Sequence, residues 1–194
     1  MIWHPLTVFL SWLAYFALHS LLAAGAVKKW TEKNAPVLYR YYRLIYNVVA
    51  TGLLIWLSLW LVRSEQVLLF EPPLWLRVIS GGVAATGLWL VGASLYGYDL
   101  GEFLGIRSAT APDDTLRVSG LNARVRHPLY LGILLAVVGG WLLWPGIDVS
   151  AVAAATLCYL PAGIYWEEQK LLLYFGDAYR EYRRRVKRLI PGVW

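Results

Sequence analysis

Long apolar runs separated by clusters of charged residues constrain the fold of this chain more than any other feature. A helix needs about 20 apolar residues to cross the roughly 30 Å hydrocarbon layer of a membrane. Runs of this kind cover residues 6–26, 44–62, 74–96, 129–144 and 149–165. Because only helices and closed barrels satisfy the backbone in lipid, we expect an all-helical integral membrane protein with about five spans. Residues 1–194 have room for one domain.

The composition supports a membrane location. Hydrophobic residues make up 59% of the chain and charged residues only 15%, which is too apolar for a soluble domain of this size. The net charge of +6 lies in the connections between the apolar runs, so we expect a lipid bilayer and no nucleic acid as partner. The single cysteine, Cys158, excludes a disulfide or paired-cysteine metal site within the chain, and we expect no metal.

The distribution of lysine and arginine predicts the orientation in the membrane. Cations crowd the first connection, the third connection and the tail, and they are fewer between the second and third spans. Because cytoplasmic loops are enriched in cations, the N-terminus is expected outside and the C-terminus inside. The first apolar run lacks a basic leader and a small-residue cleavage site, so we interpret it as a retained span.

The last two spans and the tail form a connected unit. Only residues 145–148 separate these spans, which predicts a helical hairpin. Beyond them, residues 166–188 are expected to form an amphipathic helix that lies along the interface or caps the bundle. Its apolar stripe repeats at alternating spacings of four and three, and Gly176-Asp177 interrupts it. The stripe consists of Leu172, Phe175, Tyr179, Tyr182 and Val186.

A histidine marks the mouth of the fourth span. His127 precedes Pro128, a residue suited to the first helical turn, so His127 is expected where free backbone N–H groups favour an anion. The neighbouring Arg124 and Arg126 fit an ordinary basic membrane flank equally well.

Two adjacent carboxylates follow the fifth span. Glu167 and Glu168 point about 100° apart on a helix, so we expect Glu167 to face the bundle and Glu168 to face water. A solvated helix end is the alternative. In the hairpin, His127 and Glu167 lie at the same membrane level, and together they would suit a zwitterionic amino-acid ligand.

These residues carry a family resemblance. The run 126–132, followed after two spans by Glu167-Glu168, the tail stripe and Ile190-Pro191, resembles the isoprenylcysteine carboxyl methyltransferase superfamily of membrane enzymes. In the front half, residues 18–23, 42–47 and 103–107 are similar to methanethiol S-methyltransferases and NnrU-type proteins.

The resemblance implies that the chain is an S-adenosylmethionine-dependent methyltransferase. It offers no general base, so the catalytic residues are unknown. Asn122 stands where the prenylcysteine enzymes have a cofactor-contacting tyrosine. The implied cofactor-binding residues are Asp114, Thr115, Leu116, Arg117, Asn122, His127, Pro128, Leu129, Tyr130 and Glu167.

The implied methyl acceptor is a small thiol, a lipid or another amphiphile. Gly163 stands where the prenylcysteine enzymes have a substrate-binding arginine, which argues against a prenylated-protein carboxylate. His19, Tyr46 and Arg107 are the substrate-side candidates, although His19 is as readily a packing residue and Tyr46 an interfacial anchor. We expect a multi-pass protein of the bacterial inner membrane whose active site faces the cytoplasm, in line with the orientation that the cations predict.

Two rival functions stay open at this point. An NnrU-like haem-binding protein with a redox or isomerase role would use His4, His19 or His127 as axial ligands. A structural membrane subunit without activity would bind neither ligand. The sequence indicates neither an oligomeric state nor a pathway.

Overall fold

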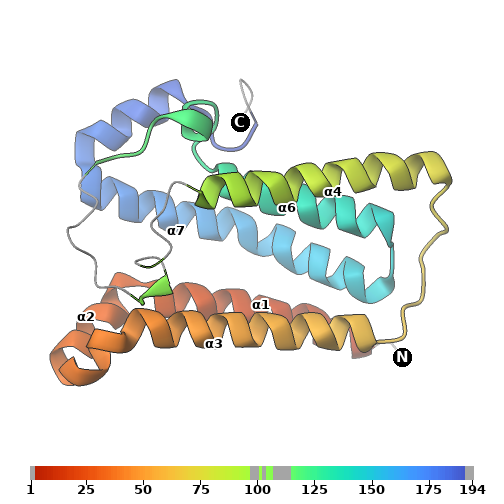
Figure 1. The fold of residues 1–194 in the computed structure, drawn as a ribbon, viewed down its shortest axis with the longest axis horizontal. Coiled ribbons are helices and arrows are strands. Elements are labelled where there is room, and N and C mark those ends of the chain that lie inside the picture. Colours follow the sequence, from red (N-terminus) through yellow and green to blue (C-terminus); the bar gives the residue numbers. More distant parts are fainter. Residues whose placement is uncertain (1–2, 97–100, 102–103, 107–114, 191–194) are drawn as a thin grey trace.

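Helices account for most of the described chain. The computed structural model describes residues 3–96, 101, 104–106 and 115–190 (Figure 1). The helices are α1 (Trp3–Ala23), α2 (Gly25–Asn34), α3 (Pro36–Arg63), α4 (Leu74–Leu95), the 3₁₀ helix η1 (Gly120–Ala123), α6 (Pro128–Leu143) and α7 (Ile147–Arg185).

The predicted spans are present as helices. Four of them, α1, α3, α4 and α7, are long and apolar enough to cross a membrane, and α6 is shorter at 16 residues. Large apolar side chains are exposed along them, for example Leu54, Ile55 and Trp56 on α3, as a lipid-facing surface requires. The chain is therefore an all-helical, multi-pass membrane protein, as the sequence predicts.

The first connection differs from the expectation. Residues 27–43 were expected to link two spans, but they form α2 and the beginning of α3. The helix α3 begins at Pro36 instead of residue 44, with proline in its first turn, where the missing N–H costs nothing.

Glycines allow the closest helix contact of the bundle, between α4 and α6. A Cβ atom at Gly87 of α4 would lie 2.3 Å from the backbone nitrogen of Ala136, and one at Gly139 of α6 would lie 2.5 Å from that of Ala84. Small residues at such positions let two helix backbones approach each other in a membrane. On the other side of the bundle, α1 and α3 pack with α7 around Val8, Leu57 and Ala155.

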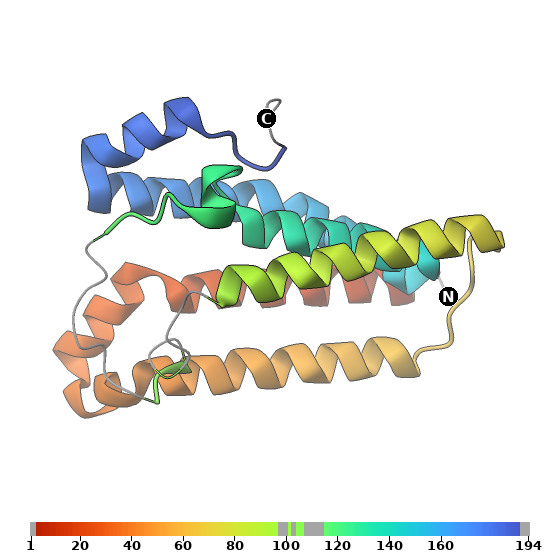
Figure 2. The same ribbon diagram turned by 45° about the horizontal axis from the view of Figure 1, so that its top comes forward.

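The helix α7 runs past the end of the span without a break and then turns back. The expected start of a separate tail helix at residue 166 is wrong, because α7 continues to a kink at Gly176, whose φ is 52°. A positive φ of this kind is accessible to glycine at little cost. Beyond the kink, the last part of α7 folds back over the residues that precede α6 (Figures 1 and 2). The stripe residues Tyr179 and Tyr182 of this last part are buried.

Alternate connections gather at opposite ends of the bundle. The cation-rich α2, the segment before α6 and the tail lie at one end, and residues 64–73 and the α6–α7 turn lie at the other (Figures 1 and 2). At that second end, the Ile147 N–H donates to the Val67 carbonyl at 2.9 Å, and Asp148 pairs with His4 at 3.0 Å.

This arrangement supports a topology test. Because the cation-rich end is expected to be cytoplasmic, reporter fusions at Lys33 and Thr110 should report a cytoplasmic location and one at Gln66 an external location. Thr110 itself lies outside the described residues. A cytoplasmic signal at Gln66 would contradict the five-span topology.

Candidate functional site

His127 is fixed at the first turn of α6 by the returning tail. It is the N-cap residue, and Pro128 follows at the first helical position. The N–H groups of Arg126 and His127 donate to the carbonyls of Lys187 and Arg188 at 2.8 and 3.1 Å. The N–H groups of Leu129 and Tyr130 belong to the first turn, so they have no intrahelical partner. This helix end can therefore offer two donors to an anion.

Glu168 is the buried hub of the site. Only 1% of the residue is exposed. Its Oε1 atom accepts from Arg126 Nη2 at 2.6 Å and lies 3.3 Å from His127 Nε2, while its Oε2 atom accepts from Arg188 Nη2 at 3.1 Å. The expectation that Glu168 faces water is wrong. Its carboxylate ties α7 to the α6 mouth and to the tail.

The charge state of this hub follows from its partners. Glu168 lies beyond the apolar run that ends at residue 165. Burial alone would raise the pKa of Glu168, but hydrogen bonds from His127 and Arg126 and the charges of Arg126 and Arg188 outweigh it and lower that pKa to about 2. Arg126 also donates to the carbonyls of Arg183 and Val186, at 3.2 and 2.5 Å, and so caps the end of α7.

Glu167 differs from its neighbour in both exposure and partners. Its side chain is 42% exposed, and its Oε2 atom lies 3.9 Å from His127 Nδ1. The expected proximity of His127 and Glu167 is thus confirmed. Tyr130 of α6 interacts with the same carboxylate. Among the described residues, no arginine or lysine lies within ion-pair distance of Glu167, so its charge is available to a ligand.

The segment before α6 brings further candidates to this end. Thr115, Leu116 and Arg117 belong to the described segment that leads into η1, and this segment is seen beside α7 (Figures 1 and 2). The Asn122 side chain donates to the Arg117 carbonyl at 3.1 Å, so in this structure it holds the loop. Its own carbonyl accepts from the Tyr182 hydroxyl at 2.6 Å. Asp114 and Arg107, two of the candidates, lie outside the described residues.

The substrate-side candidates meet across α1 and α3. The Tyr46 hydroxyl lies 3.0 Å from His19 Nε2 and 3.1 Å from Nδ1. Beside this pair, Ser20 of α1 hydrogen-bonds to Tyr159 of α7.

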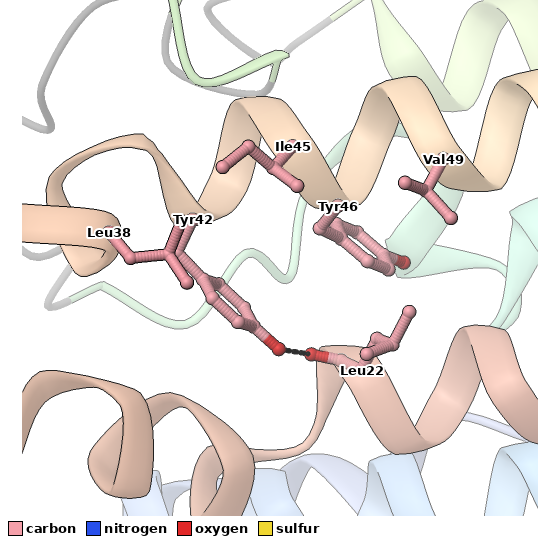
Figure 3. A pocket seen from close by; sticks show the side chains of 6 residues that line it. All are labelled: Leu22, Leu38, Tyr42, Ile45, Tyr46 and Val49. Atoms are coloured by element: carbon pink, nitrogen blue, oxygen red, sulfur yellow. Dashed lines mark hydrogen bonds between the residues drawn. The ribbon is translucent and has the colours of Figure 1, made fainter. Parts of the chain in front are cut away.

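Tyr46 also lines a cavity of about 270 Å³ between α1 and α3 (Figure 3). The other lining residues are Leu22, Leu38, Tyr42, Ile45 and Val49.

The comparisons with known proteins show the family of this chain. The model of the family described as "NnrU protein" matches residues 7–177. The chain belongs to the NnrU protein family. Among its relatives, methanethiol S-methyltransferase 2 of Bradyrhizobium diazoefficiens is 31% identical over 197 residues, covering 91% of this chain and 69% of the relative. Methanethiol S-methyltransferase 1 of the same organism is 30% identical, covering 92% of this chain and 64% of the relative.

A further match covers less than half of the chain. Protein-S-isoprenylcysteine O-methyltransferase of Schizosaccharomyces pombe is 31% identical over 89 residues, which are 45% of this chain and 38% of the relative. This NnrU-family chain spans about two thirds of the length of the two Bradyrhizobium relatives. No solved structure gives a significant match.

The three histidines of this NnrU-family chain do not gather. His4 and His19 lie fifteen residues apart on α1, which corresponds to about 22 Å along the helix axis. His4 pairs with Asp148 at the end opposite the α6 mouth, and His127 is buried against Glu168. Groups of three or more histidine, cysteine, aspartate or glutamate residues that could hold a metal ion are absent from the described part of the chain.

Sequence reasoning missed two kinds of residue in this NnrU-family site. The motifs contain Arg126 and Glu168, but the expected cofactor contacts were assigned to their neighbours His127 and Glu167, and Arg188 was in no motif. The signal for Glu168 was present in the spacing, because Glu168 lies four residues before Leu172 and so continues the stripe. Ser20 and Tyr159 carried no motif, and only the packing of α1 against α7 brings them together.

Proposed function

We propose that this chain transfers a methyl group from S-adenosylmethionine to a small thiol at the end of the bundle where the α6 mouth meets Glu167. The observation that carries the proposal is the contrast between the two carboxylates. Glu168 is buried and neutralised by arginines, whereas Glu167 is partly exposed beside a helix N-terminus. The Glu167 carboxylate attracts a cation, and the neighbouring helix N-terminus attracts an anion. Together they fit the ammonium and the carboxylate of an amino-acid group.

The residues present fit the cofactor as follows. Glu167 would hold its ammonium group, and the N–H groups of Leu129 and Tyr130, with His127, would hold its carboxylate. The segment 115–117 would cover it. When bound, S-adenosylmethionine supplies an electrophilic methyl group on a sulfonium, so the chain mainly has to orient its reactants and exclude water.

The acceptor is proposed to be a small thiol because the relatives are named for methanethiol. The surroundings of Gly163 support a small acceptor. A Cβ atom at this position would lie 3.2 Å from a Tyr159 ring carbon and 3.4 Å from a Tyr130 ring carbon. The two tyrosine rings therefore occupy the space into which a side chain longer than that of glycine would extend from position 163. An arginine like that of the prenylcysteine enzymes would not fit there. The orientation derived from the cation distribution would place this site at the cytoplasmic face.

Calorimetric titration of the full chain with S-adenosylmethionine tests the proposal. Glu167→Gln should lower the affinity about tenfold to a hundredfold, because a hydrogen bond to a charged group contributes about 1.5–3 kcal/mol. Glu181→Gln is the matched control, since this carboxylate lies on the same helix beyond the kink, in an exposed pair with Arg185. The affinity of Glu181→Gln for S-adenosylmethionine should equal that of the parent.

Three outcomes decide between the possibilities. Parent protein that does not bind S-adenosylmethionine contradicts the proposed function. Parent binding with an unchanged Glu167→Gln affinity removes Glu167 from the site. Equal losses in Glu167→Gln and Glu181→Gln would mean that the effect is one of overall charge.

A further inference from the structure

Polar side chains face one another between α1, α3 and α7, away from the residues proposed to hold the cofactor. His19 and Tyr46 meet between α1 and α3, where His19 is exposed, and Ser20 meets Tyr159 between α1 and α7. Two aromatic rings lie beside the imidazole, with the Tyr15 and Tyr46 centroids 6.1 and 5.4 Å from that of His19. An ionisable side chain within a membrane helix is costly and therefore points to a function.

We propose that the acceptor thiol binds with its sulfur at the Tyr46 hydroxyl and the His19 imidazole, and that His19 takes the proton of the thiol. This inference rests on the proposed methyl transfer, whose acceptor it places. It assigns a proton acceptor for the thiol, a role that the residues proposed to hold the cofactor do not fill.

The adjoining cavity fits a short alkyl chain. Its lining is apolar apart from two tyrosines. The Tyr42 hydroxyl is already bonded, because it donates to the Leu22 carbonyl at 2.6 Å (Figure 3). The Tyr46 hydroxyl lines the same cavity, and among the described residues it hydrogen-bonds only to His19. A small thiol has the matching pattern, with an apolar body and one weakly polar S–H group.

Tyrosine side chains connect this cavity to the proposed cofactor site. Tyr46, Tyr130 and Tyr159 interact electrostatically with one another, and Tyr130 also interacts with Glu167. The Tyr130 and Tyr159 rings lie together against the α7 backbone at Gly163. The proposal places the sulfur atom at Tyr46, the cavity residue that interacts with Tyr130 and Tyr159.

The proton transfer involves only the thiol, which gives up the proton, and His19, which accepts it. A thiol is largely protonated near neutral pH, and its thiolate is the nucleophile. The S–H bond breaks, both of its electrons stay on sulfur, and the proton moves to one ring nitrogen of His19. The Tyr46 hydroxyl then donates a hydrogen bond to the thiolate and stabilises its charge. His19 later returns the proton to water.

Ethanethiol added to the full chain in lipid nanodiscs, without donor, tests the binding step. The three histidines give three sets of imidazole NMR signals, assigned by the variants His4→Gln, His19→Gln and His127→Gln. Ethanethiol should shift the His19 signals and leave those of His4 unchanged. Tyr46→Phe should abolish the shift, whereas Tyr42→Phe, which lines the same cavity, should preserve it. Unmoved His19 signals would overturn the proposal.

Methyl transfer to two thiols tests the proton transfer. His19→Gln keeps a hydrogen-bonding side chain but cannot act as a base, so its kcat/KM for ethanethiol should fall about a hundredfold, within the range typical of general bases. For trifluoroethanethiol, a more acidic thiol of similar size, the kcat/KM of His19→Gln should fall by no more than about tenfold. Equal losses for the two thiols would contradict a base role for His19.

Failure of the proposed function is distinguishable from failure of this inference. S-adenosylmethionine affinity, measured by calorimetry, should be equal in the parent, His19→Gln and Tyr46→Phe. If ethanethiol moves the His19 signals while the parent binds no S-adenosylmethionine, the thiol site stands and the methyl transfer fails. If the parent binds S-adenosylmethionine and ethanethiol leaves His19 unmoved, the thiol site fails alone.

Discussion

Replacing Glu168 with glutamine is expected to destabilise the whole end of the bundle that carries the candidate site. The carboxylate is buried and pairs with Arg126 at 2.6 Å and Arg188 at 3.1 Å. Removing one partner of a buried ion pair leaves an uncompensated charge and typically costs about 3–5 kcal/mol. The unfolding midpoint in detergent, followed by tryptophan fluorescence, should fall markedly, and S-adenosylmethionine binding should be lost with it.

The pH dependence of this contribution has a defined sign. The pKa of Glu168 is lowered to about 2 in the folded protein, below the value of about 4.3 for an unperturbed glutamate. Its stabilisation is therefore fully present above pH 4.3 and is lost as the pH falls toward 2. The parent should lose stability more steeply across this window than Glu168→Gln.

Two further variants serve as controls for the hub. Glu181→Gln removes an exposed carboxylate from the same helix and should change stability by no more than about 1 kcal/mol. Arg126→Gln combined with Glu168→Gln should recover part of the loss, because the buried charge of Arg126 is then no longer left without its carboxylate, whereas Arg188 is partly exposed. A Glu168→Gln protein that melts with the parent would show that the ion pairs do not hold the tail.

Hydropathy alone was enough to predict the helices of the bundle. The apolar run 74–96 became α4 almost to the residue, because the length of a span is set by the thickness of the membrane. The connection 27–43 was predicted less well. The helix α2 and the beginning of α3 contain charged residues such as Lys33 and Arg40, so they form no apolar run and hydropathy does not predict them as helices.

The candidate site was predicted in outline and wrongly in one detail. The hairpin brings His127 and Glu167 to 3.9 Å, as the lengths of the last two spans require. The error was to place Glu168 in water. Leu160, Ile164, Glu168 and Leu172 recur every four residues, so the buried face of α7 runs through Glu168. A carboxylate that is buried on that face must be paired with cationic side chains.

The position of those cations could not be predicted from spacing. Arg188 reaches Glu168 only because α7 kinks at Gly176 and its last part folds back. The sequence marked Gly176 as an interruption, but it did not give the direction of the turn. The direction depends on the tail pairing with the residues before α6, where Val125 lies beside Lys187.

The glycines of α4 do not share one role. All four, Gly81, Gly82, Gly87 and Gly92, lie on this helix, where small residues permit close helix contacts. In the structure only Gly87 of these four meets a neighbouring helix, and a Cβ added at the other three would find nothing within 4 Å. A glycine pattern thus indicates which helix is contacted closely, while the helix rotation decides which glycine is used.

Gly87→Ala is therefore expected to separate α4 from α6. The added Cβ atom would lie 2.3 Å from the Ala136 nitrogen and 2.6 Å from the Gly132 carbonyl oxygen. Both are backbone atoms, so no side chain can rotate to make room, and the two helices must move apart. Overpacking in a core typically costs about 1–3 kcal/mol, and a clash with backbone should reach or exceed the upper value. The unfolding midpoint in detergent measures the loss.

Gly92→Ala is the matched control on the same helix. It makes the same chemical change five residues further along α4, where the added methyl group meets no atom within 4 Å. Because alanine is favoured over glycine in a helix by roughly 0.5–1 kcal/mol, this variant should be as stable as the parent or slightly more so. Its opposite sign separates the effect of helix contact from that of helix propensity. If Gly87→Ala also melts at or above the parent midpoint, α4 and α6 do not approach each other at Gly87.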